Sequence, residues 1–243
     1  MGTMLVRERY KVIWVLDTQE DYAFVEAVDI LDREKSACLL NIYERSLLRT
    51  YLPCFDQMQN CPAFRGMFLD GESLVTVFDT CKGESIDRIF YRGDRHEWKI
   101  RLDYAERLLH QALNMADLPP AVSCAAMLSE NVRIDLKSDT LALRFQVVPM
   151  EEMNPRELVY LTCDQLRKIL LPRFASPMEE LELLDELDQG TCQNVVQLYA
   201  LWREREGAIR AAYEALSKKN FFRRWCALLW GRCKRWAVRR KGR

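Results

Sequence analysis

The sequence predicts an α+β fold in which a small antiparallel sheet precedes a mainly helical region. Short runs rich in valine, isoleucine, phenylalanine and tyrosine fill residues 10–79, which is typical of strands. From residue 98 onward, apolar residues recur at steps of three and four, which is typical of helices. Hydrophobic residues make up 49% of the 243 residues, so the chain has enough apolar side chains to form a packed core.

Five strands and one helix are expected before residue 80. The strands cover residues 10–16, 22–31, 38–43, 64–69 and 74–78. Asp70-Gly71 joins the last two strands, because an Asp-Gly pair favours a two-residue hairpin turn. A short helix is expected within residues 46–59, where Pro53 disturbs it. These elements predict an antiparallel meander with a helix after its third strand.

A long helix, a second hairpin and three more helices follow. Asp94 is the candidate cap of the long helix, whose apolar pattern covers residues 98–113 and which Pro119-Pro120 ends. The hairpin is expected over residues 131–148. The last three helices are expected to begin near residues 154, 176 and 193.

The starts and ends of these last helices follow known rules. The first two start with a cap residue, a proline and an acid in the order that a helix start favours. Gly190 closes the second, because glycine adopts the left-handed conformation found at many helix ends. Their amphipathic patterns carry no identifiable chemistry.

The composition excludes several classes of site. The nine cysteines are odd in number and several lie in apolar runs, so we interpret them as buried thiols in a reducing cytosol. With only two histidines and no Cys-x-x-Cys pair, a zinc site of the usual spacing has no ligands. The glycines form no G-x-G pair, so no phosphate loop or dinucleotide fingerprint is present. We therefore expect no metal, no cofactor and no catalytic residue.

Neither a secretion signal nor a membrane span is expected. Charged residues interrupt the first twenty positions, which removes the apolar region of a signal peptide. No stretch reaches the ~18 apolar residues that a spanning helix needs. The sequence therefore predicts a cytoplasmic protein.

The order of these elements, with several short motifs, resembles the protein kinase fold. Residues 73–79 followed by 82–86 resemble the fifth strand, the hinge and the start of the next helix. Residues 130–135 resemble the end of the catalytic loop and the strand after it, and residues 141–146 lie where the Asp-Phe-Gly motif and its preceding strand would be. The resemblance covers about residues 8–150.

This resemblance implies a two-lobed fold with a small antiparallel β-sheet lobe and a mainly helical lobe that is shorter than usual. The domains it implies are residues 1–85 for the sheet lobe and 86–216 for the helical lobe. Residues 217–243 form a separate basic amphipathic helix at the C-terminus.

At the positions that carry kinase chemistry, the sequence departs from the family. Residues 18–24 replace the glycine-rich loop without a glycine and with two carboxylates. Asn41 replaces the lysine that pairs with phosphate, and Ala126 replaces the catalytic aspartate. Arg144 replaces the metal-binding aspartate. Asn131 alone matches a residue that binds metal in the family, although we favour for it a role in capping local backbone.

The departures imply a degenerate, pseudokinase-like member of the family. Phosphoryl transfer depends on these charges for positioning and stabilisation, and several are missing together. We therefore expect a non-catalytic scaffold or regulator whose protein partner the sequence does not name. We also expect Arg144 to fill the nucleotide site by pairing with Glu20, Asp21 or Glu26. The alternatives are an atypical serine/threonine kinase that binds ATP and a nucleic-acid-binding adaptor.

Charge is unevenly distributed along the chain. Lysine and arginine total 36, as do aspartate and glutamate, so the net charge is +0. Residues 217–243 hold eleven of the basic residues and no acid, so this basic tail carries +11 and the preceding 216 residues carry −11. Such segregation points to a separate interaction of the tail.

The basic tail is amphipathic when drawn as a helix. Its apolar side includes Phe222, Trp225, Leu229, Trp230 and Trp236, and its basic side includes Arg223, Arg224, Lys234 and Arg235. A helix with aromatic residues on one side and cations on the other suits the surface of an anionic membrane. Docking on the acidic body and binding to nucleic acid are the alternatives. Cys226 and Cys233 lie on the apolar side, where they could accept acyl chains.

Overall fold

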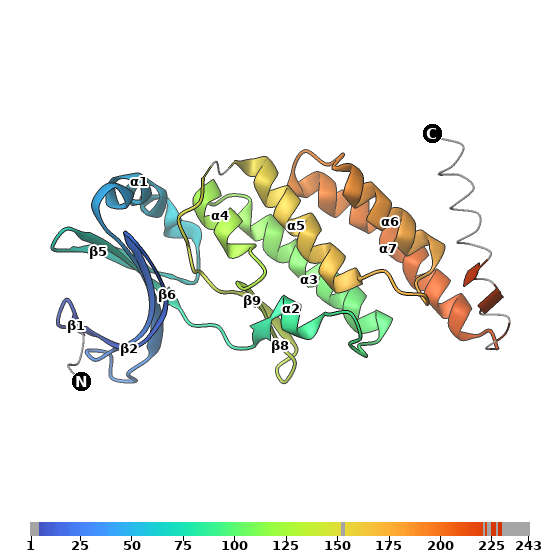
Figure 1. Cartoon of the computed structure of the whole chain (residues 1–243), viewed down its shortest axis with the longest axis horizontal. Coiled ribbons are helices and arrows are strands. Elements are labelled where there is room, and N and C mark those ends of the chain that lie inside the picture. Colours follow the sequence, from blue (N-terminus) through green and yellow to red (C-terminus); the bar gives the residue numbers. More distant parts are fainter. Residues whose placement is uncertain (1–4, 152–153, 221, 223–224, 227, 230–243) are drawn as a thin grey trace. The chain divides into compact units, whose positions relative to one another are not determined.

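The computed structural model describes residues 5–151, 154–220, 222, 225–226 and 228–229 (Figure 1). Residue contacts group the chain into two units. The first unit comprises residues 1–85 with 114–158, and the second comprises residues 86–113 with 159–243. The division into residues 1–85, 86–216 and 217–243 stays a prediction.

The first unit is built on a six-stranded antiparallel sheet. Its strands are β1 (Leu5–Val6), β2 (Tyr10–Gln19), β3 (Tyr22–Asp29), β4 (Ala37–Tyr43), β5 (Phe64–Asp70) and β6 (Ser73–Asp79), in the order β1-β2-β3-β4-β6-β5. The five strands expected from the sequence are present, and Asp70 pairs with Ser73 across the expected hairpin turn. β2 extends to Gln19, three residues beyond the expected end, because Gln19 pairs with Tyr22 across a tight turn.

The sheet curls and is covered by one helix. Tyr10 on β2 stacks on Phe68 of β5 with 5.6 Å between the ring centres, although these strands lie near opposite edges of the sheet. Helix α1 (Arg45–Asp56) packs against β4 and β6 (Figure 1). It continues through Pro53, which the sequence predicts as a disturbance, because its buried Tyr51 and Phe55 pack among aromatic side chains of the sheet.

A three-stranded sheet and a short helix complete the first unit. The strands β7 (Glu84–Ser85), β8 (Val132–Asp135) and β9 (Thr140–Leu143) pair in the order β7-β8-β9. The expected hairpin is confirmed, but its second strand ends at Leu143 and not at 148. Helix α4 (Pro120–Ala126) begins at the proline pair, which the sequence predicts only as the end of the preceding helix.

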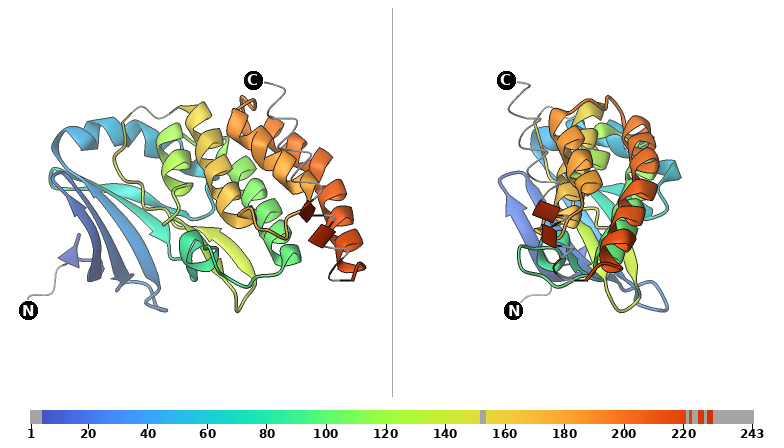
Figure 2. Two further views of the ribbon diagram at one scale, coloured as in Figure 1. Left: turned by 45° about the vertical axis from the view of Figure 1, so that its right-hand side comes forward. Right: turned by 90° about the vertical axis from the view of Figure 1, so that its right-hand side faces the viewer.

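The second unit is helical. It contains α2 (Ile86–Ile89), most of α3 (Trp98–Met115) and α5 (Pro155–Leu170), with α6 (Met178–Gln189) and α7 (Val195–Ser217). Helices α6 and α7 lie side by side (Figure 2). Gly190 ends α6 in a left-handed conformation, as expected. None of the helices in the described part of the chain combines the length and apolar character needed to span a membrane.

Asp94 does not cap α3, contrary to the sequence prediction. The helix begins four residues later, and the Asp94 carboxylate accepts hydrogen bonds from the guanidinium groups of Arg101 and Arg173, the latter at 2.6 Å. Burial opposes the charge of Asp94, but these bonds and one from the His96 N–H outweigh it and lower its pKa to about 2. A buried ion pair therefore takes the place of the expected cap.

Candidate functional site

Asn41 on β4 lies at the centre of a buried hydrogen-bond network in the first unit. Its side chain has no exposed surface. The carbonyl oxygen accepts from the Tyr22 hydroxyl at 2.9 Å and from the Val147 N–H at 2.8 Å, and the amide nitrogen donates to the Phe145 carbonyl at 3.0 Å. Burial raises the pKa of the Tyr22 hydroxyl, so it remains a protonated donor. Asn41 therefore binds protein groups with both ends of its amide.

The segment after β9 is fixed along the sheet by these contacts. Tyr43, two residues after Asn41 and on the same side of β4, donates from its hydroxyl to the Val147 carbonyl at 2.7 Å. The Phe145 ring stacks on Phe78 of β6 with 4.9 Å between centres. Residues 145–147 thus contact β4 and β6 through backbone and side chain together.

Asn131 forms the second buried amide of the network. Its amide nitrogen donates to the Ala125 carbonyl at 2.7 Å and to the Gln146 carbonyl at 3.0 Å. Its side-chain oxygen accepts from Arg144 Nε at 3.2 Å. The single oxygen that could bind a metal ion therefore faces a cation.

Arg144 lies between neutral partners. Its Nη2 donates to Gln146 Oε1 at 2.8 Å, and Gln146 in turn donates to Asp17 on β2 at 2.8 Å. The guanidinium carbon lies 5.5 Å from the centre of the Phe24 ring, which is within the range of a cation–π contact. Burial, with Arg133 nearby, lowers the pKa of Arg144 below its usual value. The Arg144 guanidinium thus contacts two side-chain amides and one aromatic ring directly. It is linked to the Asp17 carboxylate only through Gln146.

The expected ion pair of Arg144 is wrong. In the described part of the chain, no ion pair joins Arg144 to Glu20, Asp21 or Glu26. Glu20 and Asp21 form the turn between β2 and β3, and both face Arg45 at the start of α1, with closest approaches of 3.8 and 3.0 Å. Glu44, which directly precedes α1, also donates its N–H to the Asp21 carbonyl at 3.0 Å. This bond holds the turn next to the start of the helix, where its carboxylates meet Arg45.

Ala126 is buried at the end of α4. All residues of this helix after Pro120 are buried, and Ala126 has no exposed surface. The stretch from Cys124 to Ala126 is therefore helical and apolar, and it includes the position to which the resemblance assigns the catalytic aspartate. The nearest acid in the following turn, Glu130, is exposed.

Comparisons with solved structures identify the architecture. The kinase domain of Mycobacterium tuberculosis PknI, in a double mutant, superposes with a TM-score of 0.57 at 8% identity over 85% of this chain and 99% of that one. Rad53 residues 1–466 in complex with AMP-PNP superpose with a TM-score of 0.53 at 14% identity over 74% of this chain. The chain has a protein kinase-like fold.

The kinase-like fold rests on structure and not on sequence. The chain spans 60% of the Rad53 structure. No family model and no curated protein sequence matches the chain. The likeness therefore establishes the architecture expected from the order of elements, an antiparallel sheet followed by helices.

The four positions to which the sequence resemblance assigns kinase chemistry fall within the first unit, and three of them join one network. Asn41, Asn131 and Arg144 are linked through residues 145–147, while Ala126 is adjacent in the chain to Ala125, whose carbonyl Asn131 binds. Gln146, Asp17 and Tyr22 belong to this site but were not expected from the sequence. Arg144 and Gln146 are two polar residues, two positions apart, in an otherwise apolar run. This pattern in the sequence could have predicted that Gln146 belongs to the site.

The residues that the structure describes hold no group of three or more histidine, cysteine, aspartate or glutamate side chains that could bind a metal ion. The acids near the network are dispersed, because Asp17 binds Gln146 while Asp21 binds Arg45. The described side chains of the network therefore bind the backbone of the chain, and they do not place several carboxylates around one point.

The basic tail is described in part. Arg223, Arg224, Trp230, Cys233, Lys234, Arg235 and Trp236 lie outside the described residues. Phe222 is 70% exposed and Trp225 is 46% exposed, on helical backbone. Leu229 is half-buried, and Leu228 is buried.

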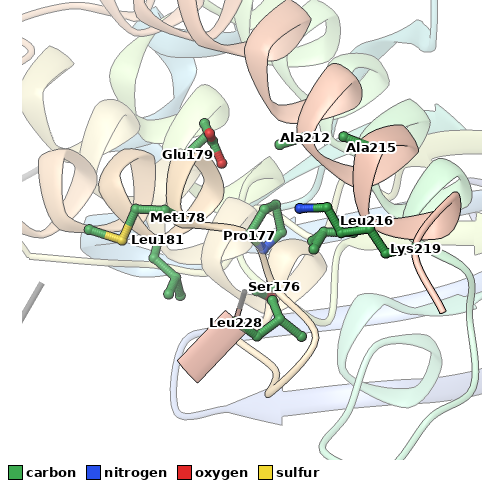
Figure 3. A pocket seen from close by; sticks show the side chains of 10 residues that line it. All are labelled: Ser176, Pro177, Met178, Glu179, Leu181, Ala212, Ala215, Leu216, Lys219 and Leu228. Carbon is green, nitrogen blue, oxygen red and sulfur yellow. The ribbon is translucent and has the colours of Figure 1, made fainter. Parts of the chain in front are cut away.

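Leu228 forms part of the wall of a cavity in the second unit (Figure 3). The cavity has a volume of about 220 Å³ and lies between the start of α6 and the end of α7. Leu181 and Leu216 contribute apolar walls, and Glu179 and Lys219 contribute charge. Asn41, Ala126, Asn131 and Arg144 do not line it.

Proposed function

We propose that the chain is a non-catalytic, pseudokinase-like scaffold or regulatory protein. Its basic tail binds an anionic membrane surface and holds the protein there. The observation that carries the first part is the hydrogen-bond network of Arg144, Asn131 and Asn41. The resemblance assigns these three residues to positions where kinases bind phosphate and metal. In this chain, Arg144 donates to Asn131, and Asn41 binds the backbone of residues 145 and 147 after β9.

Charge supports the loss of nucleotide handling. Mg²⁺ binds carboxylate and other oxygen ligands, whereas Arg144 places a cation beside the one retained asparagine. Asn41 is neutral, and both ends of its amide are already hydrogen-bonded. Loss of one preorganised charge-stabilising group costs ~3 to 4 kcal/mol of activation free energy in other enzymes, and three such groups differ here.

Thermal unfolding with and without Mg·ATP tests the first part. A ligand present at ~100 times its dissociation constant stabilises a protein by ~2.7 kcal/mol, which corresponds to a shift of several degrees for a chain of this size. We expect no shift at millimolar nucleotide. A saturable, Mg²⁺-dependent shift supports the atypical kinase instead.

Exposed aromatic residues and concentrated charge support the membrane part. Phe222 and Trp225 present apolar surface on helical backbone, within a tail that carries +11. Each basic residue close to an anionic leaflet adds ~1 kcal/mol of binding free energy, and salt screens this contribution. The buried Leu228 does not oppose membrane binding, because Phe222 and Trp225 remain exposed while Leu228 lines the cavity between α6 and α7.

Vesicle flotation tests the membrane part. The full chain is expected to float with vesicles that contain phosphatidylserine, to stay at the bottom with neutral vesicles, and to be released by salt. The variant Arg223→Glu/Arg224→Glu should lose most of the binding. Arg33→Glu/Lys35→Glu reverses two exposed charges in the first unit and is the matched control. Equal binding by both variants, or binding only to RNA, rejects the membrane part.

A further inference from the structure

The loop between α2 and α3, residues 90–97, is held by one buried carboxylate. Asp94 in this α2–α3 loop accepts hydrogen bonds from the N–H groups of Tyr91 and His96, each at 3.0 Å. The same carboxylate pairs with two guanidinium groups, one on α3 and one after α5. The backbone of the loop is therefore fixed by the second unit itself.

The α2–α3 loop presents cations to solvent. Arg92 and Arg95 flank Asp94 in the sequence, and both are exposed. Lys99, in the first turn of α3, is exposed as well. In the part of the chain that the structure describes, no ion pair joins any of these three cations to an acid. Tyr91, which precedes Arg92, is 55% exposed. The loop thus combines cations that lack an acidic partner with exposed aromatic surface.

Helices α3 and α7 bring this loop to the end of α7. The Trp98 ring at the start of α3 stacks on the Tyr213 ring of α7 with 4.8 Å between the ring centres. Further pairs along the two helices are Asp103 with Arg210 and Glu106 with Arg203. The helices therefore run antiparallel, and the start of α3 lies beside the end of α7 (Figures 1 and 2).

The basic tail begins at the same end of the second unit. Lys218 directly follows α7 and is five residues after Tyr213, which is ~8 Å along a helix. Lys218 and Lys219 are both exposed. The exposed acids Glu97 and Glu214 offset part of the charge here. Five exposed cations, three from the α2–α3 loop and α3 and two from the tail, therefore share one end of the unit with these two acids.

Exposed aromatic residues accompany the cations. Phe174 is exposed and follows Arg173, which binds Asp94 of the α2–α3 loop. Phe222 and Trp225 are exposed on the tail. Aromatic side chains among basic residues are typical of surfaces that lie at the boundary between lipid headgroups and acyl chains. Charge alone would suit any polyanion, but the exposed aromatic residues favour a membrane.

We propose that the α2–α3 loop binds the same anionic membrane surface as the basic tail, so that this end of the second unit faces the lipid headgroups. Since this rests on the membrane binding proposed for the tail, the loop and the tail act together. A loop that is already fixed loses little conformational entropy on binding, so more of its electrostatic attraction contributes to the affinity. Contacts from both segments hold the second unit in one orientation on the membrane.

Partitioning of the full chain into vesicles of phosphatidylserine and phosphatidylcholine tests the role of the loop. Arg92→Glu/Arg95→Glu should lower the partition coefficient ~tenfold or more, because attraction at two positions becomes repulsion. Arg92→Lys/Arg95→Lys keeps both charges and should partition like the original chain. The control Arg33→Glu/Lys35→Glu, in the exposed turn between β3 and β4, should leave the coefficient unchanged. Thermal melts establish that each variant is folded.

Hydrogen exchange gives a second readout, which a change in folding would not reproduce. With vesicles that contain phosphatidylserine, the N–H groups of Arg92 and Arg95 should exchange more slowly than without vesicles. The N–H groups of Arg33 and Lys35 should exchange at the same rate in both samples. Vesicles of phosphatidylcholine alone should slow neither pair.

The possible failures of the loop and of the tail are distinguishable. If Arg92→Glu/Arg95→Glu partitions like the original chain while Arg223→Glu/Arg224→Glu does not, the tail alone contacts the membrane and the role of the loop is wrong. If the original chain does not bind the vesicles, or binds only RNA, the membrane role of both segments is wrong. Equal loss of binding in the Arg33→Glu/Lys35→Glu control would also overturn the assignment of this surface.

Discussion

Arg144 reverses the charge expected at a metal-binding position, and its neighbours accommodate the reversal. Asn131 and Gln146 provide amide oxygens at 3.2 and 2.8 Å, and Phe24 provides an aromatic face. A buried cation costs free energy unless hydrogen bonds compensate it. The residues of this network therefore depend on one another.

Replacement of Arg144 by alanine should destabilise the first unit. The change leaves the side-chain oxygens of Asn131 and Gln146 without this donor, which typically costs ~1 to 3 kcal/mol. Chemical denaturation measures the loss. Arg33→Ala, at an exposed position of the same unit, should change stability by less than ~0.5 kcal/mol. Equal stability of the two variants contradicts the assigned role of Arg144.

Asn41→Ala should cost more, because Asn41 serves three buried groups. The Tyr22 hydroxyl, the Phe145 carbonyl and the Val147 N–H lose their partner together. We expect a loss of ~3 kcal/mol or more in the free energy of unfolding. The exposed Asn60 provides the control, Asn60→Ala. A loss in the Asn41 variant no larger than in this control would show that water replaces the amide.

Among the elements, the small sheet depends on one glycine. Gly83 has φ of +102°, a conformation that other residues rarely adopt, and a Cβ atom there would collide with the backbone of Ile134. β7 can pair with β8 because Gly83 allows this close approach. Arg133 also donates to the Gly83 carbonyl at 2.7 Å.

Two glycine substitutions should therefore have opposite effects. Gly83→Ala should lower the free energy of unfolding by more than ~2 kcal/mol. Gly207→Ala, in the exposed middle of α7 where a Cβ meets no atom within 4 Å, should raise it by ~0.5 to 1 kcal/mol. Thermal unfolding distinguishes the two. Stabilisation by both changes would contradict the close packing of β7 on β8.

Helix α6 carries a buried acid with a predictable pH dependence. Glu180 is 1% exposed and accepts from the Tyr213 hydroxyl at 2.6 Å. Burial raises its pKa, against hydrogen bonds from Ser176 and Tyr213. Since the folded state holds this proton more tightly than the unfolded state, the stabilisation is present at low pH and is lost as pH rises through the folded pKa.

Glu180→Gln should consequently gain stability relative to the original chain as pH increases. Glutamine keeps an acceptor for Tyr213 but is never ionised. Unfolding free energies measured from pH 4 to pH 8 should diverge in favour of the variant. Glu182→Gln, exposed on the same helix, is the control. A gain that does not grow with pH contradicts the buried acid.

At the scale of the whole molecule, the sequence predicts the elements well and their partners poorly. Alternating apolar residues and Asp70-Gly71 place the strands, because these signals are local. Helix α4 escapes prediction, since a helix that is buried on every side has no amphipathic period. The partner of Arg144 escapes as well. A carboxylate is the strongest partner in principle, but the β2–β3 turn directs the nearby acids to Arg45.

The kinase-like architecture was predicted from the order of elements, and the site was predicted only as a set of substitutions. Asn41, Asn131 and Arg144 could be named from the sequence because the resemblance to the kinase fold assigns a position to each of them. Gln146 and Asp17 could not, because they lie 129 residues apart and meet only in the folded chain.

Hydrogen exchange at residues 145–147, with and without Mg·ATP, tests the central claim most directly. The Val147 N–H is buried and donates to Asn41, so it should exchange slowly. We predict that millimolar Mg·ATP leaves the exchange of residues 41, 131 and 144–147 unchanged, since these groups already bind one another. A nucleotide-dependent change in exchange at these residues, saturable and dependent on Mg²⁺, would contradict the account.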